Sequence, residues 1–170
     1  MARTVEKLDI DNPEHATFMY DLAVACQDDF LNDADTDIII LMHEYNQAIK
    51  DGNTVAFLCQ ENGENAGIIW ADIDRHAVGY MHAGLMPQYR QGFTALHFAR
   101  LFVDFCFRQL ELNSLEAQLP THNRVAEVLM RRIGFRKYGL RPFAMKVNGR
   151  PEKHVLFAMT KDNWEALKNG

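Results

Sequence analysis

The chain has 170 residues, of which 48% are hydrophobic and 24% are charged, and its formal net charge is −5. A chain of this length and composition can bury a core without cross-links, so we expect a single domain over residues 1–170. The acidic balance excludes a broad nucleic-acid surface, and the apolar runs are too short to span a bilayer.

The first residues and the cysteines predict the cellular compartment. Arg3, Glu6, Lys7 and Asp9 interrupt the N-terminal stretch, so it lacks the apolar segment of a signal peptide. The three cysteines are widely spaced and form no CxxC pair, which favours reduced thiols. We therefore expect a cytoplasmic protein with no membrane contact and no metal site.

The first half of the chain predicts a strand, two helices and three further strands. Thr4–Leu8 is strand-like, and Asn12 before Pro13 predicts the capped start of a helix. A second helix, ended by Gly52, is predicted by apolar residues at helical spacing, namely Ile38, Leu41, Met42, Tyr45 and Ile49. Runs rich in β-branched and aromatic residues then predict an antiparallel meander at Thr54–Cys59, Ala66–Ile73 and Ala77–Met86, with turns at Asn62-Gly63 and Asp74-Arg75.

The second half predicts helices that alternate with strands. A long helix is expected at about Thr94–Leu110, a strand at Ser114–Leu119, and a further helix that opens at Asn123. Two late strands, around Pro142–Val147 and His154–Thr160, precede a short tail. The order β-α-α-β-β-β-α-β-α-β-β predicts an α/β (α+β) fold with a mixed, mainly antiparallel sheet and helices on both faces.

The segment Leu85–Ala95, LMPQYRQGFTA, joins the third meander strand to the long helix. The first turn of a helix offers free N–H groups and a positive dipole end, which suit a phosphate, and Gly92 would let the backbone approach one. The alternative is a strand-to-helix turn that needs Gly92 for backbone reasons alone.

The segment Asn123–Phe135, NRVAEVLMRRIGF, begins at a natural N-cap and ends at Gly134, a natural C-cap, with Phe135 placed to pack back on the helix. Together the two segments resemble the conserved blocks of the GCN5-related N-acetyltransferases (the GNAT superfamily). The second block resembles the pattern N-x-x-A-x-x-L-Y-x-K-x-G-F, and the matching residues are Asn123, Ala126, Leu129, Arg132, Gly134 and Phe135. The order of helices and strands is also that of the superfamily.

The resemblance implies acetyl-CoA as co-substrate. The first block is similar to the loop R/Q-x-x-G-x-G/A, read from Arg90, whose backbone amides cradle the pyrophosphate; Ala95 fits its final position. It implies that the N–H near Leu85 faces the thioester oxygen and that Asn123 bonds the pantetheine arm. The implied cofactor-binding residues are Leu85, Arg90, Gln91, Gly92, Phe93, Thr94, Ala95 and Asn123.

Two residues depart from the pattern. Phe93 stands where the loop has its first glycine, and Met130 stands where the tyrosine that often serves as general acid is expected. The third meander strand offers His82 as general base, and a half-buried histidine without a catalytic role is the alternative. Tyr138 is the candidate substitute for the missing acid.

The charges are unevenly distributed. Residues 1–50 hold 11 acids and 3 bases, whereas residues 90–150 hold 11 bases and 4 acids. Two solvated faces that attract each other would explain this, as would a basic half that meets an anion and an acidic half that meets a cation.

The acids between the first two helices lie where the superfamily shapes its acceptor pocket. These acids, which could attract a cationic amine, are Asp28, Asp29, Asp33, Asp35 and Asp37. The alternative is a solvated connector in which Asp35, Thr36 or Asp37 caps the helix. A calcium loop is excluded because Ile38 stands where that loop needs glycine.

We therefore expect an acetyl-CoA-dependent N-acyltransferase that acetylates a small-molecule or protein amine by direct attack, with a homodimer as a compatible form. The alternative is a catalytically degenerate protein of this fold with a binding or structural role, for example in the assembly of a phage particle.

Overall fold

A single mixed sheet runs through the parts of the chain that the computed structural model describes, residues 2–26, 38–90, 93–147 and 150–169. In these residues the strand order is β1-β2-β3-β4-β5-β7-β6, and every neighbouring pair is antiparallel except β4 with β5. The strands are β1 (Arg3–Lys7), β2 (Thr54–Glu61), β3 (Glu64–Ile73), β4 (Val78–Leu85), β5 (Ser114–Pro120), β6 (Arg136–Val147) and β7 (Arg150–Thr160). The expected mainly antiparallel sheet is confirmed.

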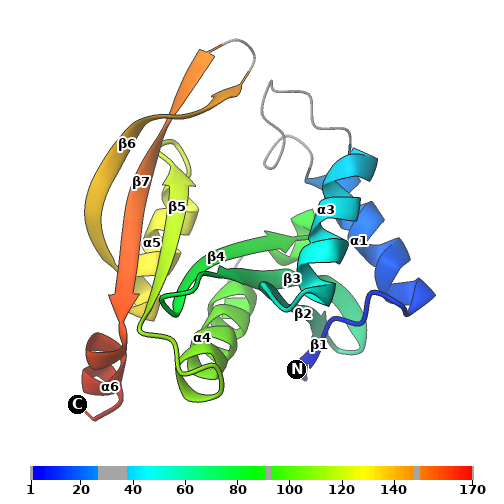
Figure 1. Cartoon of the computed structure of the whole chain (residues 1–170), viewed down its shortest axis with the longest axis horizontal. Coiled ribbons are helices and arrows are strands. Elements are labelled where there is room, and N and C mark those ends of the chain that lie inside the picture. Colours follow the sequence, from blue (N-terminus) through cyan, green and yellow to red (C-terminus); the bar gives the residue numbers. More distant parts are fainter. Residues whose placement is uncertain (1, 27–37, 91–92, 148–149, 170) are drawn as a thin grey trace.

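Helices cover both faces of this sheet. Figure 1 shows α1 (Pro13–Ala25) and α3 (Ile38–Lys50) together on one side of β2–β4 and α4 (Phe93–Arg108) on the other. The side chains of α5 (Arg124–Ile133) and α6 (Lys161–Asn169) join the core on the α4 side. The expected helices on both faces are thus confirmed. Among the described residues, no helix is long and apolar enough to span a membrane.

The alternation of side chains along the strands divides the core into two layers. Along β3, Ile68 and Trp70 pack under α1 and α3, whereas Ile69 and Ala71 pack against the α4 side. Successive side chains of a strand point to opposite faces, so a strand covered on both faces is apolar at nearly every position. β2 and β3 therefore read as continuous apolar runs.

The predicted helix caps are confirmed. Asn12 Oδ1 accepts the N–H of Glu14 at 2.9 Å, and Asn123 Oδ1 accepts the N–H of Ala126 at 3.0 Å. Gly134 ends α5 at φ 114°, a left-handed conformation that favours glycine.

The prediction of a short tail after Thr160 is wrong, because residues Lys161–Asn169 form the helix α6. Thr160 Oγ1 accepts the N–H of Asn163 at 3.3 Å at the start of this helix. Trp164 is buried, stacks on Phe107 with ring centroids 5.4 Å apart, and donates its Nε1–H to Asp104 at 2.9 Å. Burial of this one large side chain docks a short polar helix that has little else to bury.

The last hairpin is longer than expected. β6 begins at Arg136 rather than near Pro142, and β7 begins at Arg150 rather than near His154. A proline inside β6 is tolerated because β6 is the edge of the sheet and its register shifts between Arg141 and Met145. The structure also forms a short 3₁₀ turn at Pro87–Tyr89, before α4.

The cysteines Cys26, Cys59 and Cys106 are free and buried. Burial raises the pKa of Cys59 and of Cys106 to about 12, so both thiols keep their protons at neutral pH.

Candidate active site

Strands β4 and β5 separate part-way along their length. Their parallel ladder ends at the pair Tyr80 and Glu116, although the strands continue to Leu85 and Pro120 (Figure 1). β3 and β7 pair with the outer edges of these strands. Beyond Tyr80 and Glu116, the inner edges therefore present N–H and C=O groups with no partner from the opposite strand. An opening of this kind inside a sheet suits an extended ligand that has amide groups of its own.

A polar cavity of about 120 Å³ lies at this opening. Its lining comes from β4, β5, β6 and β7 and includes His82, Glu116, Tyr138 and Arg141. The two residues that the sequence suggested for catalysis, His82 and Tyr138, thus line the same cavity, although they come from different strands.

His82 forms an ion-pair contact with Asp72 when it is protonated. His82 Nε2 lies 3.2 Å from Asp72 Oδ2, and the buried Thr54 donates its hydroxyl to Asp72 Oδ1 at 2.6 Å. Burial alone would raise the pKa of the Asp72 carboxyl. The hydrogen bonds from His82 and Thr54 outweigh this effect and hold that pKa below its ordinary value. Asp72 therefore stays ionised at neutral pH and accepts a hydrogen bond from the imidazole.

Tyr138 is bonded to a carboxylate across the cavity. Its hydroxyl donates to Glu116 Oε2 at 2.8 Å, and Glu116 lies opposite Tyr80 in the ladder. Burial of the hydroxyl, the hydrogen bond to Glu116 and the negative charge of Glu116 together raise the pKa of Tyr138 to about 12. Within the described residues, the Glu116 carboxylate has no ion pair. Arg141 also lines the cavity, but its hydrogen bond goes to Gln118 Oε1 at 3.2 Å and not to Glu116.

The segment between β4 and α4 is held by side chains that the resemblance had assigned to the cofactor. Arg90 donates its Nε–H to the Leu85 carbonyl at 2.9 Å and an Nη2–H to Cys26 Sγ at 3.0 Å. Gln91 and Gly92 lie outside the described residues. Phe93, at the start of α4, is 71% exposed, and the backbone of the first helical turn through Ala95 carries N–H groups that the helix itself cannot satisfy.

A second carboxylate lies beside this helical turn. Glu61 Oε1 accepts the hydroxyl of the buried Thr94 at 3.0 Å and the Nε–H of Arg3 at 2.7 Å. The hydrogen bond from Arg3 contributes most to the lowered pKa of Glu61, which is therefore an anion at neutral pH. The Thr94 side chain is thus committed to the protein, and an anion at this turn would meet backbone N–H groups near an internal, ion-paired carboxylate.

The second sequence block has clear structural roles. Asn123 is exposed, and its Oδ1 is used by the cap of α5. Met130 is 6% exposed and packs in the core on the α4 side. In this chain, Met130 therefore places an apolar core side chain where the resemblance implies the acid. The acids between residues 27 and 37 lie outside the described residues.

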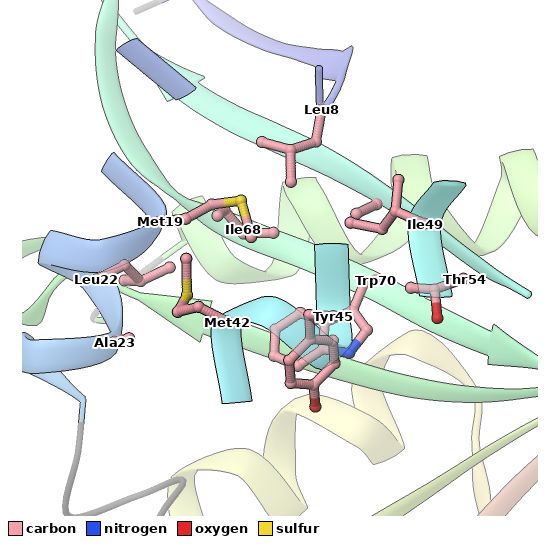
Figure 2. Close-up of a pocket in the computed structure, with 11 residues that line it drawn as sticks. Leu8, Met19, Leu22, Ala23, Met42, Tyr45, Ile49, Thr54, Ile68 and Trp70 are labelled. Atoms are coloured by element: carbon pink, nitrogen blue, oxygen red, sulfur yellow. The ribbon is translucent and has the colours of Figure 1, made fainter. Parts of the chain in front are cut away.

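An apolar cavity of about 110 Å³ lies between α1, α3 and the sheet. Figure 2 shows Met42 and Tyr45 of α3 facing Met19 and Leu22 of α1 and Trp70 of β3. The Tyr45 and Trp70 rings meet edge to face at 5.4 Å. On the side of the polar cavity, Trp70 stacks on His82, with ring centroids 5.2 Å apart and planes inclined by 16°. His82 in turn lines that cavity. One aromatic side chain thus joins the two cavities.

No sequence pattern identified Asp72 or Glu116 as a residue of the site. Asp72 follows Trp70 by two positions on the same face of β3, and the hairpin register places it beside His82. That signal was present, but reading it requires the exact pairing across the 74–77 turn. Glu116 meets Tyr138 only because β5 and β6 both flank β7, which no local pattern reveals.

The whole structure is similar to solved acetyltransferases. A spermidine N-acetyltransferase from Vibrio cholerae, solved in complex with CoA and spermine, is 18% identical, with a TM-score of 0.82 over 96% of this chain and 98% of the other. RimJ from Mycobacterium smegmatis, solved with CoA-disulfide, is 16% identical, with a TM-score of 0.77 over 98% of this chain and 89% of the other. The sequence matches no protein-family model and no curated protein. These similarities show a shared fold.

Proposed function

We propose that this chain, which has the fold of the GCN5-related N-acetyltransferases, is an acetyl-CoA-dependent N-acyltransferase. The observation that supports this most is the separation of β4 from β5 beyond Tyr80 and Glu116, with His82 at the cavity beside the opening. The solved neighbours named above include proteins bound to CoA or CoA-disulfide. The expectation from the sequence and the geometry of the opening therefore point to the same reaction.

The residues present fit acetyl-CoA in two places. The inner edges of β4 and β5 offer main-chain groups to the amides of the pantetheine arm, and the first turn of α4 offers N–H groups to the pyrophosphate. The thioester supplies the activated acyl group. Leu85, Phe93, Thr94 and Ala95 would contribute through their backbones, and Asn123 through its side-chain N–H₂ group, because its Oδ1 caps α5. Arg90 would contribute by holding the segment in place through its bonds to Leu85 and Cys26.

The acceptor is a cationic amine in this proposal. The Glu116 carboxylate, which has no ion pair among the described residues and lies between Tyr80 and Tyr138, would attract an ammonium group to the cavity. The Vibrio cholerae neighbour was solved with spermine, a cationic amine, which is consistent with an acceptor of this class. His82 would take the proton that the amine must lose before it attacks the thioester.

Tyr138 would act here by hydrogen bonding rather than as a proton donor. Its pKa of about 12 lies far above the ordinary thiol pKa of about 8.5, so proton transfer from the phenol to a departing thiolate is uphill. The hydroxyl instead orients the Glu116 carboxylate.

Calorimetry with acetyl-CoA tests the first half of the proposal. We expect a dissociation constant on the order of micromolar and a matching rise of the melting temperature. Phe93→Gly should bind more tightly, since it removes an exposed ring from the first turn of α4. Phe143→Gly, at an equally exposed phenylalanine on β6, is the matched control and should leave binding unchanged.

Acyl transfer to a panel of amines tests the second half. Release of the CoA thiol together with a mass increase of the amine identifies acceptors. Glu116→Gln should raise KM for cationic acceptors and leave KM for neutral ones unchanged. Binding of acetyl-CoA without transfer to any amine would contradict the enzymatic proposal.

A protein that keeps the fold for binding or assembly is the second candidate. The buried Met130 at the expected acid position and the exposed Phe93 at the phosphate turn favour it. Absence of a melting-temperature shift at millimolar acetyl-CoA would decide for this candidate.

A further inference from the structure

The Asp72 carboxylate contacts one ring nitrogen of His82 with one oxygen and accepts a hydrogen bond from Thr54 with the other. Its Oδ2 contacts His82 Nε2 at 3.2 Å, and its Oδ1 accepts the Thr54 hydroxyl at 2.6 Å. Thr54 is 4% exposed at the start of β2, so its hydroxyl has little freedom. The carboxylate therefore has one oxygen fixed by a donor from the protein and the other directed at the imidazole.

The plane of the imidazole is fixed as well. Trp70 lies opposite His82 in the β3–β4 register and stacks on its ring at 5.2 Å. A face contact and an edge contact on one ring restrict both side-chain torsions of His82. Trp70 and Asp72, which make these two contacts, both belong to β3. The ladder between β3 and β4 therefore fixes their positions relative to His82.

The second nitrogen of His82 is left for a ligand. Nε2 is the atom in contact with Asp72, and Nδ1 has no hydrogen bond or ion pair to the described residues. His82 also lines the polar cavity. An ionised carboxylate can only accept a hydrogen bond, so the neutral imidazole must keep its proton on Nε2, and its lone pair is then on Nδ1.

We propose that Asp72 is a positioning residue that selects the Nε2–H tautomer of His82, so that Nδ1 receives the proton of the attacking amine. The catalytic part rests on the proposed function, whereas the choice of tautomer does not. In the reaction, an N–H bond of the acceptor ammonium breaks and its proton bonds to Nδ1. The amine lone pair then forms the bond to the acyl carbon as the carbon–sulfur bond breaks and CoA leaves as its thiolate. The proton that the new amide nitrogen still carries in excess passes to this thiolate, so that the neutral amide and the CoA thiol are the products. The imidazolium is stabilised by the Asp72 carboxylate.

Asp72→Asn should reverse the tautomer. Thr54 would still donate to the amide oxygen, which turns the amide N–H₂ toward His82 Nε2. Nε2 would then become an acceptor, the proton would move to Nδ1, and the base would be lost. ¹⁵N chemical shifts of the imidazole, assigned with a His82→Gln variant, report this change directly. A wild-type Nδ1–H tautomer, or an unchanged tautomer in Asp72→Asn, would overturn the proposal.

Two further variants separate positioning from a structural role. Asp72→Ala removes the selection without imposing the wrong tautomer, so we expect Asp72→Asn to lose more kcat than Asp72→Ala, by on the order of tenfold or more. Thr54→Val in the Asp72→Asn background frees the amide to turn, and should restore part of the Nε2–H tautomer and of kcat. A purely structural Asp72 predicts the opposite order, with the truncation worse than the isosteric change.

The outcomes also separate this inference from the proposed function. If wild-type protein transfers no acyl group but shows the Nε2–H tautomer, and Asp72→Asn reverses it, the positioning by Asp72 stands and the proposed reaction fails. If transfer occurs but kcat is equal in the two Asp72 variants and the tautomer is unchanged, the reaction stands and the positioning role fails.

Discussion

At the scale of single residues, the pair Tyr138 and Glu116 shows how a neighbouring carboxylate in the cavity fixes the protonation state of a phenol. Tyr138 is 55% exposed, yet its hydroxyl donates to the Glu116 carboxylate, and its pKa rises to about 12. Phenolate formation would place two negative charges side by side. The group is therefore a permanent hydrogen-bond donor at physiological pH.

The titration of Tyr138 can be measured by the ultraviolet absorbance of the phenolate. We expect one tyrosine to ionise near pH 12, and this step should be absent in Tyr138→Phe. Glu116→Gln should lower the pKa of Tyr138 toward the ordinary value of about 10, because it removes the negative charge. An unchanged titration in Glu116→Gln would show that burial alone raises the pKa.

The sign of the linked stability follows from the direction of this shift. The folded pKa lies above the unfolded value of about 10, so the interaction stabilises the fold fully below pH 10. The contribution is lost as pH rises from about 10 through about 12. The Tyr138→Phe variant should therefore approach wild-type stability at the alkaline end of this window, in urea titrations performed at several pH values.

At the scale of elements, the junction between α5 and α6 shows where the local pattern was sufficient and where it was not. Gly134 was predicted as a C-cap and has the required φ of 114°. A Cβ at this position would also overlap Leu167 of α6, a contact that no pattern around Gly134 indicates. The glycine thus serves both the end of α5 and the docking of α6.

A pair of glycine variants separates these two effects. Gly52→Ala places a side chain at φ 76° with nothing within 4 Å, so it should cost only the backbone strain, about 1 kcal/mol. Gly134→Ala adds the overlap with the end of the Leu167 side chain, which must turn aside, and should cost about 0.5–1.5 kcal/mol more. Urea unfolding measures both.

Leu167→Ala provides the control for this comparison. In its background, the excess cost of Gly134→Ala over Gly52→Ala should shrink, because the overlapping methyl groups are gone. Equal costs for the two glycine variants in the wild-type background would mean that α6 does not pack against this position in solution.

At the scale of the whole molecule, one sheet separates two apolar layers, and each layer holds one of the two tryptophans. Trp70 lies under α1 and α3 and is 8% exposed, whereas Trp164 lies between α4 and α6 and is 9% exposed. β2 and β3 contribute side chains to both layers. Loss of one layer would therefore expose the sheet that supports the other.

The two tryptophans test whether the chain unfolds as the single domain that we expect. Trp70→Phe and Trp164→Phe each leave one fluorescent reporter, in opposite layers. Within each variant, the urea midpoint from fluorescence should equal the midpoint from far-ultraviolet circular dichroism. Trp164→Phe should also lower stability by about 1 kcal/mol, because it removes the hydrogen bond to Asp104. Separate midpoints would indicate two independently folding layers.

The sequence by itself determined the features that depend on neighbouring residues. Helical spacing, the caps at Asn12, Asn123 and Gly134, and the apolar strand runs predicted most elements, their order and hence the fold class. The sequence also indicated His82 and Tyr138 individually. It missed α6, which is short and polar and is held by the burial of Trp164 against α4, a contact far along the chain.

Only the tertiary structure decided how the site is composed. The contacts of Thr54 with Asp72, of Asp72 with His82 and of Glu116 with Tyr138 join different strands, and each depends on strand order or on a register that one residue of slip would reverse. The opening between β4 and β5 likewise comes from where a ladder stops, which no local pattern encodes. Short-range preferences therefore selected the fold, and long-range pairing selected which side chains meet within it.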